Sequence, residues 1–501
     1  MKKFFPVYPI LLGLIWVIAT YVGNKSILPS ASVMVTPLLV VTGCIAAVGL
    51  ITQLFVKDWG KSAMVASSFF LFTVFHGYIR DYTHTDGMAA APIWLVLMLA
   101  SIFIVLKITR PTGRLHLTVV SNVLCISILL VCTYSAFFTK SEVATKEYDY
   151  TPEVVNSIHN PTPDVYYIIP DTYASFSVLE NYLDYDNSEF YDYLVDKGFD
   201  VVYDSKTNYH HTILSVSSVL NMRYWTDEEL GSEAARYLGN RMYQNPVADT
   251  FKEAGYTYVH IGSWWGFTSS NNQADITKEY SKLKEFPFAL YRGTIWYDLA
   301  DFLFDMGGNH ILREAHLGQF DSLVEVSKMP EKTFTFCHLI TPHPPFLFDA
   351  EGNNTSGWML PPDEWREMYL DQLTFITTKL EETIGTILSN SDVTPIIILA
   401  ADEGYAGTDW QEYWTSRGGL KTVVEDRPDL VFKRQGNLFA ILNPYKGELE
   451  VPISPVNTFK YVFNSLFDSN LDYLPDKYFL KSLGENEHEF IDVTEFINGE
   501  D

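Results

Sequence analysis

The chain has 501 residues, a formal net charge of -26 at pH 7 and four cysteines, of which only Cys337 lies beyond residue 142. Its length allows more than one domain. Its acidity argues against a nucleic-acid-binding protein, because duplex binding depends on Lys and Arg that neutralise phosphates. The charge is unevenly divided: residues 1–142 carry a net +6 and residues 143–501 a net -32. The two parts of the chain therefore face different surroundings.

Long apolar runs open the chain. They cover residues 4–22, 33–56, 63–79, 92–106 and 115–138. A helix needs about 20 residues to cross the hydrocarbon core of a bilayer, so we predict a membrane domain of five spans over residues 1–139. The fourth run is the shortest. No cleavage site of small residues follows the first run, which we interpret as an uncleaved helix rather than a signal peptide.

Basic residues gather in alternate loops between these runs. One side of the predicted spans carries Lys2, Lys3, Lys57, Lys61, Lys107, Arg110 and Arg114. By the positive-inside rule this side is cytoplasmic. The sequence therefore predicts a multi-pass protein of the plasma membrane with its N-terminus in the cytoplasm. A polar linker at residues 140–163 would lead to an extracytoplasmic domain at residues 164–501.

Residues 164–501 alternate between short runs typical of strands and longer runs typical of helices. We predict strands at residues 165–169, 201–203, 256–261, 333–339, 396–399 and 438–442, and helices at 189–197, 247–254 and 364–388. This alternation favours an α/β domain with a largely parallel sheet and helices on both faces.

Two of the predicted strands are followed by acidic residues. Asp171 comes after Val-Tyr-Tyr-Ile-Ile-Pro, and Asp402-Glu403-Gly404 comes after Ile-Ile-Ile-Leu-Ala-Ala. In open α/β sheets, ligands bind at the carboxyl ends of the strands. Adjacent carboxylates there repel each other unless a cation or an exposed surface relieves them. A metal site is one interpretation; the other is that Asp171 merely caps a helix or forms a turn.

Further polar residues lie where a ligand could reach them. Thr212 stands near the start of a short apolar helix, where the helix dipole favours an anion, unless it is merely close to a cap. His343 lies between prolines that hold its backbone stiffly, whereas His338, inside a predicted strand, is interpreted as a core histidine. Four more residues have two possible roles: they line a ligand-binding cleft, or they only contribute to ordinary packing of a loop and of the core. These residues are Trp264, Trp265, Asn272 and Asp275.

Together these blocks resemble the lipoteichoic acid synthase and phosphoglycerol transferase type of enzyme, the membrane-anchored branch of the alkaline phosphatase and sulfatase superfamily. The resemblance covers about residues 163–480 and the five-span architecture. It implies that Asp171, Thr212, Asp402 and Glu403 bind one divalent metal, that Thr212 is the nucleophile, and that His343 contacts substrate. Glu403 stands where better-known members carry His, and an all-oxygen site suits Mg²⁺ or Mn²⁺ better than Zn²⁺.

The resemblance implies a transferase that moves a phosphoglycerol- or phosphoethanolamine-type head group from a membrane phospholipid to a glycan or polymer of the cell envelope, through a phospho-threonyl intermediate. Three alternatives stay open. A sulfatase is disfavoured, because its modified nucleophile cannot be made from Thr212. A phosphodiesterase differs only in transferring the group to water. The last alternative is a non-catalytic membrane protein that retains the fold for binding, and Glu403 favours it.

Overall fold

The computed structural model describes residues 5–24, 31–83, 87–108, 111–137, 162–230, 234–278, 285–304, 308–357, 362–410, 420–451, 454–481 and 490–499. Contacts between residues divide the chain into two compact units. Unit 1 comprises Met1–Glu142 and Leu283–Ile311, and unit 2 comprises Val143–Lys282 and Leu312–Asp501. The predicted linker at residues 140–163 lies almost wholly outside the described residues.

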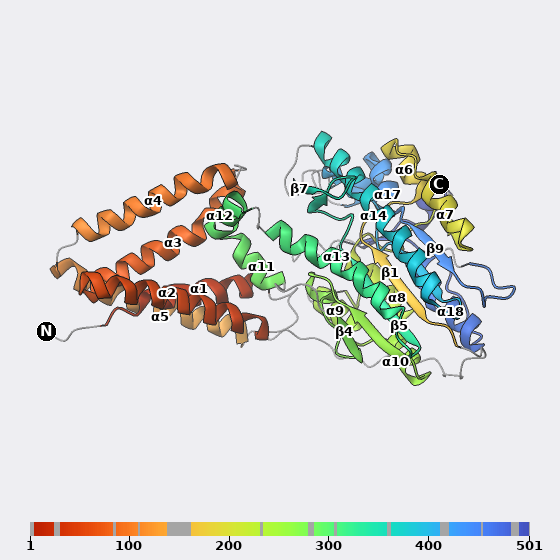
Figure 1. Ribbon diagram of the computed structural model, residues 1–501, viewed down its shortest axis with the longest axis horizontal. Helices are drawn as coiled ribbons and strands as arrows, with labels where there is room; N and C mark the ends of the chain where they lie inside the picture. Colours follow the sequence, from red (N-terminus) through yellow and green to blue (C-terminus); the bar gives the residue numbers. More distant parts are fainter. Residues whose placement is uncertain are drawn as a thin grey trace. The chain divides into compact units, whose positions relative to one another are not determined.

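The N-terminal part of unit 1 is a bundle of apolar helices (Figure 1). They are α1 (Tyr8–Gly23), the 3₁₀ helix η1 (Ala31–Met34), α2 (Val35–Val56), α3 (Trp59–Thr83), α4 (Gly87–Ile108) and α5 (Pro111–Phe137). In the described part of the chain, four helices are long and apolar enough to cross a membrane, and these correspond to α2, α3, α4 and α5. Helix α1 has 16 residues and falls short of that length, so the fifth span stays a prediction.

Large apolar side chains are exposed on these helices. Leu39, Leu54, Phe55, Val96 and Val131 are all more than half exposed. Many of the large exposed apolar side chains of this protein lie on these helices, and where such side chains gather they mark a surface that contacts a membrane or a partner. The outward-facing side chains therefore agree with helices that contact lipid.

A second stretch of chain completes unit 1. It contains α11 (Glu285–Arg292) and α12 (Ile295–Phe304). Phe286 and Leu290 of α11 belong to an apolar cluster that includes side chains of α1 and η1, and Ile295 and Leu299 of α12 cluster with Ala91 of α4. These two short helices are thus packed among the apolar helices, although about 140 residues of unit 2 precede them in the chain.

Unit 2 is built on a seven-stranded sheet in the order β2-β9-β8-β1-β5-β3-β4. Its strands are β1 (Val165–Pro170), β2 (Asp200–Val202), β3 (Thr257–Ile261), β4 (Ile276–Lys278), β5 (Thr333–Leu339), β8 (Ile396–Ala400) and β9 (Phe439–Leu442). β9 pairs antiparallel with both of its neighbours, and the other strand pairs in this sheet are parallel. The predicted α/β fold with a largely parallel sheet is confirmed, and the six predicted strands are all present.

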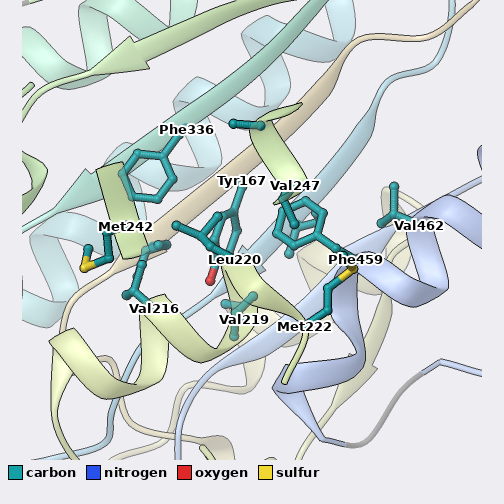
Figure 2. Packing of buried hydrophobic residues seen from close by; sticks show 14 of the residues in the cluster. Tyr167, Val216, Val219, Leu220, Met222, Met242, Val247, Phe336, Phe459 and Val462 are labelled. Carbon is teal, nitrogen blue, oxygen red and sulfur yellow. The ribbon is translucent and has the colours of Figure 1, made fainter. Parts of the chain in front are cut away.

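Side chains alternate across the central strand of this sheet, because successive residues of a strand point to opposite faces. Tyr166 and Ile168 belong to one buried cluster, and Tyr167 and Ile169 belong to another. Figure 2 shows the second cluster, in which Tyr167 and Phe336 from the sheet meet side chains of several helices. Among these helices are α8 (Thr212–Asn221), α10 (Pro246–Glu253) and α18 (Thr458–Phe467).

The opposite face of the sheet is covered by α6 (Phe176–Leu183), α7 (Ser188–Asp196) and α14 (Pro362–Asn390), with α13 (Gly308–Val326) beside them. The helices predicted at residues 189–197, 247–254 and 364–388 are α7, α10 and α14. The remaining elements of unit 2 are α9 (Ala234–Tyr243), η2 (Gly266–Thr268), β6 (Phe346–Phe348), β7 (Asn354–Gly357), α16 (Leu420–Asp426), α17 (Pro428–Gln435), η3 (Pro455–Asn457), β10 (Phe479–Lys481), β11 (Phe490–Asp492) and α19 (Thr494–Asn498).

Candidate metal and nucleophile site

The site begins at the carboxyl end of β1, the central strand. Asp171 follows Pro170 and is buried, and its N–H donates to the Leu339 carbonyl of β5 at 2.9 Å. The next residue, Thr172, has φ 61, a left-handed conformation that is costly for a β-branched residue and is concentrated at functional sites. Its N–H donates to Oδ1 of Asp402 at 3.3 Å. The turn after β1 is thus held against the end of the neighbouring strand β8.

Asp402 and Glu403 follow β8, and both are buried. Glu403 Oε2 lies 2.6 Å from Nη2 of Arg434, whose side chain comes from α17 and is only 7% exposed. Arg434 also donates from Nη1 to the Gly404 carbonyl at 3.1 Å. Glycine is needed at 404, because a Cβ there would lie 2.3 Å from the Gly436 carbonyl oxygen. Glu403 is therefore engaged in a buried ion pair beside the carboxylate of Asp402.

Thr212 is the first residue of α8, as the sequence predicts for a helix start. The preceding His211 is extended and its carbonyl accepts from the N–H groups of Leu214 and Ser215, so the first two N–H groups of the helix, those of Thr212 and Ile213, have no partner within it. Thr212 is half-buried, and its hydroxyl interacts with the Asp402 carboxylate, an interaction that partly opposes the rise in the pKa of Asp402 caused by burial. A polarised hydroxyl at a helix N-terminus is placed where an anionic oxygen is favoured.

His338 of β5 completes the cluster, although the sequence led us to interpret it as a core histidine. Ligand atoms of Asp171, His338 and Asp402 all lie within 4.8 Å of one another, and all three residues are buried. His338 Nε2 is 3.4 Å from Asp171 Oδ2, and Nδ1 is 2.9 Å from the Thr268 hydroxyl. The residue is buried as expected of a core histidine, but it faces two carboxylates. Its position near the end of the strand next to β1 is the signal that could have revealed it.

His343 lies in the proline loop that follows β5. Its N–H donates to the Asp171 carbonyl at 3.2 Å, and Gln372 of α14 donates to the His343 carbonyl at 3.2 Å. Ring atom Nδ1 is 2.5 Å from the Pro344 carbonyl oxygen. Because a carbonyl only accepts hydrogen bonds, Nδ1 carries a proton. The loop thus brings a half-buried imidazole beside Asp171, with Nε2 as its other polar atom.

The carboxyl groups of the cluster influence one another. Burial would raise the pKa of Asp171, but the nearby His343, His338 and Arg434 outweigh it and hold that pKa below its ordinary value. Burial and the Asp171 charge raise the pKa of Asp402 to about 7, and burial raises the pKa of Glu403 well above its ordinary value even though Arg434 opposes this. A bound cation stabilises the charged forms of buried carboxylates that lie this close together.

The residues present fit a divalent metal ion. Within the described part of the chain, Oδ1 of Asp171 is a buried carboxylate oxygen with no hydrogen-bond partner, an arrangement that costs free energy unless another ligand satisfies the oxygen. Two carboxylates, one imidazole and the Thr212 hydroxyl offer both oxygen and nitrogen donors. Carboxylate and imidazole ligands are used by Mn²⁺ and Zn²⁺ alike, whereas Mg²⁺ prefers oxygen alone.

The other four residues named as cleft candidates have different positions. The ring of Trp265 lies 5.9 Å from that of His338 in an edge-to-face arrangement, so Trp265 borders the cluster. Asp275 instead accepts from the Tyr258 N–H at 2.9 Å and pairs with Lys252, which is a structural role at the edge of the sheet. Trp264 is half-buried and Asn272 is exposed.

No family model matches the sequence, and no curated protein matches it. The fold is similar to that of several solved structures. The C-terminal periplasmic domain of EptC from Escherichia coli has 12% identity and a TM-score of 0.45, and the match covers 68% of this chain and 96% of that one. The integral membrane lipooligosaccharide phosphoethanolamine transferase A (EptA) from Neisseria meningitidis has 11% identity and a TM-score of 0.42, covering 92% and 94%.

A phosphonate monoester hydrolase of Agrobacterium radiobacter is also similar, with 10% identity, a TM-score of 0.41 and coverage of 64% of this chain and 80% of that one. By their own names, the solved structures found include transferases and a hydrolase. At these levels of identity, the chemistry proposed below rests on the residues of this chain.

Proposed function

We propose that this protein is a membrane-anchored, metal-dependent transferase that moves a phosphoglycerol- or phosphoethanolamine-type group from a lipid to an acceptor in the cell envelope. The observation that carries the proposal is the Thr212 hydroxyl, which stands at the start of α8 beside the buried group of Asp171, His338 and Asp402. An activated hydroxyl next to a metal site is the arrangement of a covalent phosphotransfer nucleophile.

The metal would be held by Asp171, Asp402 and the Thr212 hydroxyl, with His338 as a further ligand. When bound, a divalent cation lowers the pKa of the hydroxyl and stabilises negative charge on the phosphate oxygens. We favour Mn²⁺ over Mg²⁺, because the donor set now contains an imidazole. Glu403 was predicted as a ligand from the sequence; its contact with Arg434 supports the different role of holding that guanidinium near the site.

Residues of this chain have different roles in two successive transfers. In the first, Thr212 Oγ gives up its proton and attacks the donor phosphorus; the bond from phosphorus to the lipid oxygen breaks, and this oxygen takes up a proton, so that the lipid leaves as an alcohol. We assign His343 to contact the substrate, with Nε2 directed at the oxygen that leaves or attacks, where it can pass on the proton. In the second, the acceptor hydroxyl gives up its proton and attacks the phospho-threonyl group, and Thr212 Oγ leaves and is protonated again. Arg434 contributes positive charge beside the transferred phosphate.

The setting supports a lipid donor. Helices that can cross a bilayer precede the site in the chain, and we propose that the N-terminus is cytoplasmic, that five helices span the membrane over residues 1–139, and that the domain from residue 164 is extracytoplasmic. A site tethered to the membrane meets phospholipid head groups at high local concentration. With so acidic an outer domain, divalent cations also help phosphates to approach.

Intact mass spectrometry of the full chain in detergent micelles tests the proposal. The protein is incubated with Mn²⁺ and micelles that contain phosphatidylglycerol or phosphatidylethanolamine. We expect wild type to gain the mass of the donor head group, Thr212→Ala to gain nothing, and the exposed control Thr378→Ala on α14 to behave as wild type.

The fate of the head group separates the related activities. Release of free head group to water without an added acceptor favours a phosphodiesterase, whereas transfer to an added glycan favours the transferase. If folded wild-type protein shows neither adduct nor released head group with Mn²⁺, Mg²⁺ or Zn²⁺, the non-catalytic binding protein becomes the better account and the proposal fails.

A further inference from the structure

The chain enters unit 1 twice. The apolar N-terminal helices form its first part, and Leu283–Ile311 returns to it after β4, before α13 continues in unit 2. The two units are therefore joined by three covalent connections, near residues 142, 282 and 311. A protein tethered only by a juxtamembrane linker would have a single connection.

The returning segment is fixed to the bundle by a buried ionic cluster. Asp298 of α12 accepts from Nη1 of Arg80 at 3.1 and 2.9 Å, and its Oδ2 also lies 3.1 Å from Nδ1 of His76. Arg80 further donates to the Arg292 carbonyl at 3.2 Å. His76 and Asp298 are almost fully buried. A buried charge is tolerated only when it is paired, so these residues of α3 and α12 depend on each other.

The backbones of the two parts also meet. Gly77 N–H donates to the Gly293 carbonyl at 3.2 Å, and a Cβ on Gly77 would lie 2.4 Å from that same oxygen. This approach is possible only because residue 77 has no side chain. The contact is therefore specific, since loose apolar packing would not need a glycine at this position.

Apolar contacts extend this interface to other helices of the bundle. Phe286 packs edge-to-face on Tyr21 of α1, with ring centroids 6.3 Å apart, and the ring of Trp296 lies 5.9 Å from that of Phe69 of α3. Ile295 of α12 is fully buried beside Ala91 of α4.

Apart from Phe69, the contacted residues named above lie near the ends of α1 and α3 and near the start of α4. These are the helix ends that the distribution of basic residues assigns to the outer side.

The exposed side chains of the segment suit the surface of a membrane. Trp296 is 40% exposed and Leu303 is 59% exposed. Aromatic side chains with a polar atom are favoured at the level of the lipid head groups, and short amphipathic helices lie in that plane.

We propose that Leu283–Ile311 is a second membrane attachment, which holds unit 2 to the apolar helices independently of residues 140–163. This role does not depend on the proposed chemistry. It predicts that a cut in the linker does not set unit 2 free.

The test uses the full chain with an affinity tag at the N-terminus and a site-specific protease sequence, flanked by flexible spacers, inserted between residues 150 and 151. The protein is purified in detergent micelles, cut, and captured again through the tag. We expect the fragment from residue 151 to stay with the tagged fragment. If cut wild-type protein releases this fragment into the unbound fraction, the proposal is overturned. The readout is independent of activity, so its failure leaves the proposed function untouched.

Matched variants show whether the described contacts cause the retention. Gly77→Val should lose it, whereas Gly43→Val should not, because a Cβ on Gly43 of α2 meets nothing within 4 Å. Asp298→Arg should also release the fragment, since it opposes Arg80 with a like charge, and the exchanged pair Arg80→Asp with Asp298→Arg should recover retention. Full retention in both Gly77→Val and Asp298→Arg would overturn the assignment of these contacts.

Discussion

Removing the Arg434 side chain tests whether the buried carboxylate of Glu403 depends on its ion pair with the Arg434 guanidinium. The two side chains lie 2.6 Å apart and are only 7% and 4% exposed. Arg434→Met leaves Glu403 buried without its partner, and breaking a buried pair from one side costs about 3–5 kcal/mol of unfolding free energy. Replacing both residues, as Glu403→Gln with Arg434→Met, removes both charges together. We therefore expect the double variant to be less destabilised than the sum of the single variants by about 3 kcal/mol.

Chemical unfolding of the full chain in detergent, followed by circular dichroism, measures these differences. The exposed pair Lys379–Glu382, 2.7 Å apart on α14, provides the control, because such surface pairs contribute about 0–1 kcal/mol. If the effects of Arg434→Met and Glu403→Gln simply add, the two residues do not depend on each other and the ion pair has no role in the site.

The same variants decide which residues bind the metal. Titration calorimetry with Mn²⁺ should show a loss of metal affinity of about 10–100-fold for Glu403→Gln, as expected of a residue that acts through its neighbours. Asp402→Asn should lose more than about 100-fold, because it removes a ligand in direct contact with the ion. An equally deep loss in Glu403→Gln, with unfolding free energy unchanged, would instead support Glu403 as the ligand that the sequence predicts.

Three further predictions concern the fold and the nucleophile. His260 is buried, and burial lowers its pKa from 6.5 to about 4, so on acidification the unfolded chain takes up a proton at this residue before the folded chain does. Between pH 6.5 and 4, wild type should therefore lose about 3 kcal/mol of unfolding free energy that His260→Gln does not lose. Parallel pH profiles of unfolding free energy for the two proteins would contradict this. Gly404→Ala should destabilise by more than about 2 kcal/mol, because its Cβ would meet two backbone carbonyl oxygens at 2.3 and 2.4 Å; a wild-type unfolding midpoint would refute the steric argument. Thr212→Ser should still form the covalent adduct and Thr212→Val should not, as judged by intact mass.

Much of unit 2 could be predicted from local sequence. The strands that precede Asp171 and Asp402 are continuous apolar runs, as expected of strands buried on both faces, and each ends at a proline or before a glycine. Because ligands bind at the carboxyl ends of such strands, the sequence alone predicts that the carboxylates of Asp171 and Asp402 lie at one site. Thr212 followed from the change to a helical pattern immediately after it.

Other parts of the site depend on contacts that local sequence does not contain. His338 has the pattern of a core residue, and only the neighbouring strand shows that its ring faces Asp171. Arg434 lies on a short helix 31 residues after Glu403, and its charge gives no sign of burial. The apolar pattern of α11 and α12 is that of ordinary surface helices, so the sequence did not indicate that Asp298 pairs with a membrane helix.

The pairing of Arg80 with Asp298 also has a consequence for synthesis. The two residues are 218 positions apart, and at 5–20 residues per second the ribosome needs about 10–40 s to bridge that interval. During this time Asp298, which pairs with Arg80 and His76 of α3, has not yet been made. The contacts that fix α12 to α3 therefore form only after the chain has been made beyond residue 298, long after α3 itself.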